Sequence, residues 1–194
     1  MKATKTLAFT FFAVVGLLFA PAAFAHTFGA HGAGFVDGLV HPFFGLDHLL
    51  AMVAVGLWAA QLGGSNLWRV PVAFVTAMTV GAIVANPAFD ATWLETAIAG
   101  SVMALGLMVA FRLRLPSLLA VAAVSCFALF HGFAHGLEMP QTASPLGYGL
   151  GFVLATASLH LIGLCLGLSM ARGHVISRIS GVAIAAVGLL LITA

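Results

Sequence analysis

The chain carries very little charge. Only 6% of its 194 residues are Asp, Glu, Lys or Arg, whereas a soluble domain carries roughly 25%. Hydrophobic residues make up 62% of the chain, so there are too few polar side chains to form a surface that water solvates. The sequence therefore predicts an integral membrane protein surrounded by membrane lipid.

Other scarcities exclude further classes of protein. The formal net charge is only +2 and the basic residues form no patch, which argues against nucleic acid as a partner. The two cysteines, Cys126 and Cys165, lie inside apolar runs and are too few for a disulfide framework. The sequence contains no Walker-type phosphate-binding loop, so we do not expect an ATP-driven pump that works alone.

The first segment resembles a targeting signal. Lys2 and Lys5 precede a short apolar run, and Ala23 and Ala25 fit a cleavage site that requires small residues. We predict a signal peptide over residues 1–25, so that the mature chain begins at His26 outside the cytoplasm. An uncleaved first span is the alternative, and it places His26 on the same side.

Six apolar segments follow, each near the length of about 20 residues that a helix needs to cross a bilayer. Stretches rich in turn-forming residues, such as GGSN and NPAFD, separate them. We therefore predict an all-α integral membrane protein, with one six-span helix bundle over residues 26–194. The predicted spans are 45–62, 68–85, 92–111, 117–137, 146–171 and 175–192.

The arginines indicate the orientation of the bundle. If residue 26 lies outside, the first, third and fifth loops face inward, and positive residues favour the cytoplasmic side. We predict a multi-pass protein of the inner (cytoplasmic) membrane, with both mature termini on the periplasmic side. The arginines that fall at the three inward loops are Arg69, Arg112, Arg114, Arg172 and Arg178.

Histidines and carboxylates gather towards the outer side of this predicted bundle. They come from four different spans, and three of them recur at spacings of four and three residues near the end of the fourth span, which places them on one helix face. Two more histidines lie on the tail before the first span. The candidate metal ligands are His41, Asp47, His48, Glu95, His131, His135, Glu138 and His160 in the bundle, and His26 and His31 on the tail.

Imidazole and carboxylate together suit a divalent transition metal such as Ni, Co, Cu or Zn. An ionisable group at the centre of a membrane helix costs about 2.5–3.5 kcal/mol on insertion scales, which argues for function. Taken alone, His160 could equally be a hydrogen-bonded packing residue, and Glu95 a charge favoured at a helix N-terminus. Pro42 and Gly45 are expected to break the helix and let non-helical backbone line a cavity.

Three motifs carry a family resemblance. HPFFGLDHLLAM, from His41, matches the HPxxGxDHxxxM signature of the HupE/UreJ family, and FHGFAHGLE, ending at Glu138, matches its second motif. TASLHLIG, from Thr156, fits a third motif of the form T-x-x-L-H. The resemblance implies a nickel permease, or a related cobalt carrier, accessory to hydrogenase or urease. It also implies that transport needs His41, Asp47, His48, His135 and Glu138, with Glu95 as a weaker match.

We therefore expect a secondary permease for Ni²⁺, or for Co²⁺, rather than an enzyme, and no prosthetic group. An intramembrane zinc hydrolase is one alternative, but the chain lacks the HExxH motif of many such enzymes. A metal-binding sensor or storage protein is another, since it requires ligands but no route to the inner side. Uptake into sealed vesicles separates the permease from both.

Overall fold

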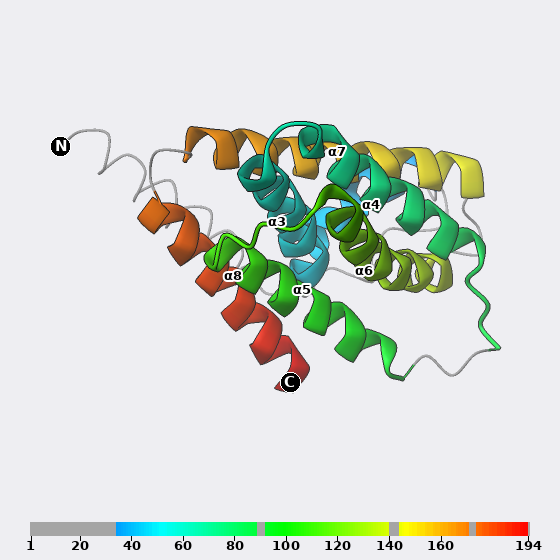
Figure 1. Ribbon diagram of the computed structural model, residues 1–194. Helices are drawn as coiled ribbons and strands as arrows, with labels where there is room; N and C mark the ends of the chain where they lie inside the picture. The colour runs from blue at the N-terminus through cyan, green and yellow to red at the C-terminus, as the bar shows by residue number, and fades with distance from the viewer. Residues whose placement is uncertain (1–33, 89–91, 140–143, 171–173, 194) are drawn as a thin grey trace. The chain divides into compact units, whose positions relative to one another are not determined.

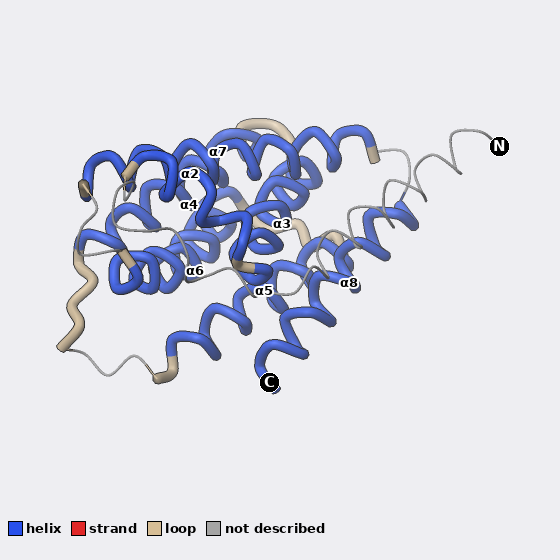
Figure 2. Tube along the Cα trace, turned by 180° about the vertical axis from the view of Figure 1, so that it is seen from behind, coloured by secondary structure: helices blue, strands red, loops and turns tan. Residues whose placement is uncertain are grey.

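The computed structural model describes residues 34–88, 92–139, 144–170 and 174–193. These residues form helices joined by turns and loops (Figures 1 and 2). From α3 onward each helix begins and ends within two residues of a predicted segment, because the apolar runs end at turn-forming residues. The predicted signal peptide, with His26 and His31, lies outside the described residues. The helices are α2 Phe35–Phe44, α3 Leu46–Leu62, α4 Asn66–Ile83, α5 Leu94–Ala110, α6 Ser117–Glu138, α7 Pro145–Ser169 and α8 His174–Thr193.

The helices α4, α6, α7 and α8 are long and apolar enough to cross a membrane, and α2 and α3 together make a fifth such segment. Helix α5 is apolar but has only 17 residues. The described residues therefore supply four or five clear spans where the sequence predicted six. Exposed leucine, isoleucine and valine side chains are frequent on these helices, as lipid-facing surfaces require. The chain is a multi-pass membrane protein.

The first span is bent, and the bend differs from the expectation in one respect. Pro42 does not break the helix but stays inside α2, which continues to Phe44. Only Gly45 is non-helical, with extended backbone (φ −88°, ψ 112°), and α3 then runs at 86° to α2. As a result His41 lies on a helix of its own, near the end that turns into α3.

Glycines allow several helices to pack with their backbones in contact. Helix α5 packs along α8, α4 along α6, and α7 along both α2 and α3 (Figure 1). A Cβ atom on Gly132 would overlap the carbonyl oxygen of Met78 between α6 and α4, and one on Gly163 would overlap that of Val53 between α7 and α3. Small residues permit this close approach in membranes. We call these two units the α4–α6 pair and the α3–α7 pair.

The apolar core lies where α3 contacts its neighbours, and it includes the fully buried side chains of Met52, Trp58 and Phe74. Polar contacts of Trp58 and Gln61 hold the C-terminal end of α3. Trp58 Nε1 donates to the carbonyl oxygen of Leu113 at 2.8 Å, and Gln61 Nε2 donates to Ser177 Oγ on α8 at 2.7 Å. These bonds fix the end of α3 opposite to the one that carries Asp47 and His48.

Candidate metal site

Three potential metal ligands meet where α2 and α6 end. His41 on α2 and His135 and Glu138 on α6 each offer one ligand atom, and these atoms lie within 4.8 Å of one another. Glu138 Oε2 is 3.3 Å from His41 Nε2 and 3.5 Å from His135 Nδ1. The Glu138 side chain is 45% exposed and that of His135 only 3%. The group is therefore open at its carboxylate and closed behind His135. We call these three residues the entry group.

Local helix geometry and one helix contact assemble the entry group. His135 and Glu138 are three residues apart on α6, so they share a face. His41 reaches them because α2 lies against α7, where Gly38 and Gly151 let the backbones touch: a Cβ on Gly38 would overlap the carbonyl oxygen of Tyr148. The first and second sequence motifs thus meet through α7, which carries only the third.

Asp47 is not in the entry group but bonds to its neighbour His48. Its Oδ1 atom accepts hydrogen bonds from the backbone N–H of His48 at 2.8 Å and from His48 Nδ1 at 2.7 Å. Gly45 leaves room for this contact, since a Cβ there would lie 2.9 Å from His48 Nδ1. The carboxylate holds the proton on Nδ1 and leaves the lone pair on Nε2, which is buried without a hydrogen-bond partner among the described residues. Metal-binding histidines are commonly oriented in this way.

His131 is oriented by a residue that the sequence analysis missed. The Ser101 hydroxyl on α5 donates to the carbonyl oxygen of Ile98 at 2.7 Å, and the same oxygen lies 2.8 Å from His131 Nε2. Ser101 therefore holds the His131 ring in place through a hydrogen bond at Nε2. Within the described residues Nδ1 has no partner. The sequence feature that could have indicated this contact is a serine in the middle of an apolar span.

Four histidine rings lie in contact one after another, beginning at the entry group. The ring centroids of His41 and His135 are 4.9 Å apart, those of His135 and His48 4.1 Å, and those of His48 and His131 4.9 Å. Phe152 packs against the His135 ring at 4.1 Å. We call this series of rings the histidine row. It offers imidazole nitrogens at successive depths, with apolar side chains beside them.

Two other predicted ligands lie apart from the entry group. Glu95 is exposed in the first turn of α5, and no hydrogen bond or ion pair joins it to the described histidines. His160 is buried in α7 and touches Phe74 instead, with ring centroids 5.1 Å apart. Tyr148, the one tyrosine of the chain, was not predicted to contribute but lies 5.9 Å from the His41 ring.

Comparison with known proteins gives the family. The family model described as HupE / UreJ protein matches residues 13–191. Protein HupE of Rhizobium leguminosarum bv. viciae is 46% identical over 170 residues, which cover 86% of this chain and 87% of that protein. No solved structure gives a significant match. Members of the matched family are membrane transport proteins associated with nickel uptake for hydrogenase or urease. The chain belongs to the HupE/UreJ family.

Proposed function

We propose that the protein is a secondary permease that imports a divalent transition metal ion, Ni²⁺ or the chemically similar Co²⁺, to supply hydrogenase or urease maturation. The observation that carries this proposal is the convergence of His41, His135 and Glu138 at one end of the helices. Two imidazoles and one carboxylate suit such an ion better than they suit Mg²⁺ or Ca²⁺. Membership of the HupE/UreJ family supports the same metal.

The entry group is suited to replace the water around an arriving ion. Glu138 is the most exposed of the three, so its carboxylate meets the hydrated ion first and supplies negative charge. The imidazoles of His41 and His135 then replace water molecules. His48 follows with its Nε2 lone pair directed by Asp47, so the ion exchanges one nitrogen ligand for another as it moves inward.

No bound nucleotide is needed to drive import. A divalent cation that crosses towards a negative interior gains about 4.6 kcal/mol per 100 mV, twice the value for one charge. An energy of this size corresponds to more than about a thousandfold accumulation. The membrane potential therefore suffices for an ion that the protein binds and releases.

We further propose the six-span topology with both mature termini outside and residues 1–25 removed. The bent pair α2–α3 supplies the first span. Helix α5, with 17 residues, lies at the lower end of the length range of membrane helices and supplies the third. A reporter that is active only in the cytoplasm, fused after Ala194, should give no signal. Strong activity would refute the orientation.

The tail is a separate proposal. If cleavage leaves His26 at the N-terminus, its imidazole and free amine together can hold a metal ion, with His31 nearby. Uptake at limiting Ni²⁺ by a variant with His26→Ala and His31→Ala should then fall below the wild-type rate. An unchanged rate would show that the tail does not deliver metal.

Uptake of Ni²⁺ into sealed proteoliposomes tests the permease. The full-length protein is reconstituted with a nickel-sensitive dye inside, and an inside-negative potential is imposed. We expect uptake by the wild type and a loss of about 10- to 100-fold in Glu138→Gln, which keeps the shape but removes the charge. Asp37→Asn is the matched control, because Asp37 caps α2 through the backbone N–H of Gly34 and lies outside the entry group.

The same vesicles separate the competing functions. A hydrolase or a sensor binds the ion without moving it, so the dye signal stays flat although equilibrium binding is measurable. That result with folded wild-type protein would refute the permease.

A further inference from the structure

The histidine row ends against an aromatic side chain. Phe74 on α4 is fully buried. Its ring centroid lies 5.8 Å from that of His131, the innermost member of the row, and 5.1 Å from that of His160 on α7. Phe74 thus stands between the row and one more histidine.

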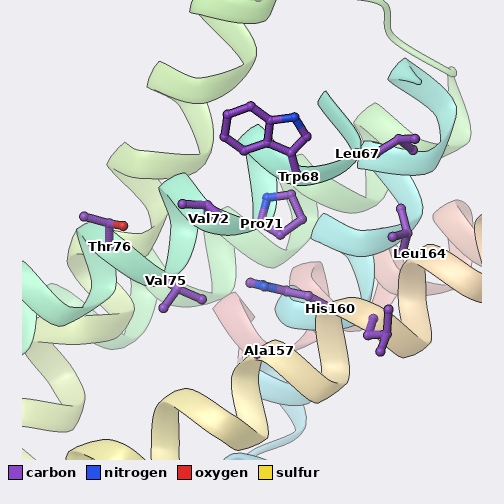
Figure 3. Close-up of a pocket in the computed structure, with 10 residues that line it drawn as sticks. Leu67, Trp68, Pro71, Val72, Val75, Thr76, Ala157, His160 and Leu164 are labelled. Atoms are coloured by element: carbon purple, nitrogen blue, oxygen red, sulfur yellow. The ribbon is translucent and has the colours of Figure 1, made fainter. Parts of the chain in front are cut away.

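His160 lies in the opposite half of the helices from the entry group. It is about 22 Å along α7 from Pro145, at 1.5 Å per residue, whereas Tyr148 and Phe152 of the first two turns face the entry group. Around His160, α7 faces the first half of α4. There a pocket of about 360 Å³ is lined by apolar side chains of both helices, among them Pro71 and Val75, and opens to the outside of the bundle beside the exposed Trp68. The His160 ring points towards these two residues (Figure 3).

Neither ring nitrogen of His160 forms a hydrogen bond with the described residues. The side chain is 2% exposed, and neither Nδ1 nor Nε2 has a hydrogen-bond partner there. His48 and His131, by contrast, each have one nitrogen bonded to a named residue. A buried polar group without a partner costs about 1–3 kcal/mol, which a phenylalanine in the same place would avoid. Burial of an imidazole at this position is therefore better explained by binding of a ligand than by packing.

We infer, on the basis of the proposed permease function, that His160 forms an inner binding site for the transported divalent metal ion, on the far side of Phe74 from the histidine row. One helical turn closer to the entry group, the Thr156 hydroxyl on α7 donates to Met78 Sδ on α4 at 4.0 Å, so two further ligand atoms lie between the row and His160. A hydroxyl oxygen, a thioether sulfur and an imidazole nitrogen are thus available at the α4–α7 contact. Imidazole and thioether are ligands that late first-row metals accept.

The helix pairs explain how an ion passes Phe74. Phe74 and His131 belong to the α4–α6 pair, and His160 belongs to the α3–α7 pair, so they lie on opposite sides of one boundary. Glycine contacts fix each pair internally, while α4 and α7 meet only through side chains such as Phe74 and His160, with an open pocket beside them. A shift of one pair against the other moves Phe74 and His131 together relative to His160. This motion transfers the ion from the row to the inner site.

The test compares His160→Phe and His160→Gln with the wild type, using the full-length protein and Ni²⁺ in the proteoliposome assay. Ser158→Ala is the control, because Ser158 is exposed on the same helix and donates to its own backbone, at Leu154. We expect both His160 variants to lose about 10- to 100-fold in initial uptake rate, with melting temperatures at or above the wild-type value. The control should match the wild type in rate.

Equilibrium binding of Ni²⁺ to the detergent-solubilised protein provides a second readout. The His160 variants should still bind Ni²⁺ at the entry group, and Glu138→Gln should weaken that binding. Wild-type uptake rates in both His160 variants would overturn the inner site and leave the permease intact. A loss of uptake found only together with a lowered melting temperature would also overturn it, since His160 would then be a packing residue. Absence of uptake by the folded wild type would refute the permease itself.

Discussion

Replacement of Gly132 by alanine tests whether backbone contact between α4 and α6 positions the ligands. The new Cβ would overlap the carbonyl oxygen of Met78, so the helices have to separate or bend. Overpacking of this kind costs about 1–3 kcal/mol. The higher helix propensity of alanine returns about 0.8–1 kcal/mol, so we expect a net loss of up to about 2 kcal/mol.

Gly100→Ala is the matched control. A Cβ at Gly100 meets nothing within 4 Å beyond its own helix. This variant therefore gains the higher helix propensity of alanine without a steric overlap. The two variants should therefore differ by about 1–3 kcal/mol, the size of the overlap penalty itself. For a chain of this length each kcal/mol corresponds to about 2–4 °C in melting temperature.

Thermal unfolding of the detergent-solubilised protein measures this difference, and nickel uptake shows its functional consequence. Gly132 adjoins His131 in the sequence and lies three residues before His135, so displacement of α6 should lower uptake as well as stability. Gly100→Ala should leave uptake unchanged. If Gly132→Ala is as stable and as active as Gly100→Ala, close α4–α6 packing does not hold the site.

Three further predictions concern the orientation and charge of the ligands. Asp47→Asn should abolish uptake with the protein still inserted and folded, because it removes the negative charge beside His48 Nδ1. Membrane fractionation and melting temperature establish folding, and wild-type uptake would refute the assigned role. Ser101→Ala should lower uptake less, by up to about 10-fold, because His131 loses the partner of Nε2; a rate above wild type would contradict this. Uptake should fall as the outer pH drops from about 7 to 5, because protons compete with the metal ion for the imidazole nitrogens, which bind metal only in the neutral form. A rate that rises over this interval would exclude imidazole as the entry ligand.

The sequence alone determined the class of protein and much of its local structure. Scarcity of charge requires a membrane protein whatever the packing, and apolar runs between turn-forming residues fix most helix ends, because both depend only on neighbouring residues. The shared face of His135 and Glu138 was predictable for the same reason, since i and i+3 meet on any helix. The motifs identified the family before any contact between helices was known.

Only the tertiary structure decided which ligands meet and which way they face. Asp47 was expected to join the metal ligands, but its carboxylate turns to His48 because Gly45 leaves space beside it. Glu95 sits at the predicted end of α5 and yet has no hydrogen bond or ion pair to the described histidines, because its depth along the helix does not fix the direction of its side chain. Ser101 acquires its role only by lying opposite His131. Such contacts depend on how separate helices pack, and the glycine contacts that permit this packing are distributed over the described helices rather than confined to any one motif.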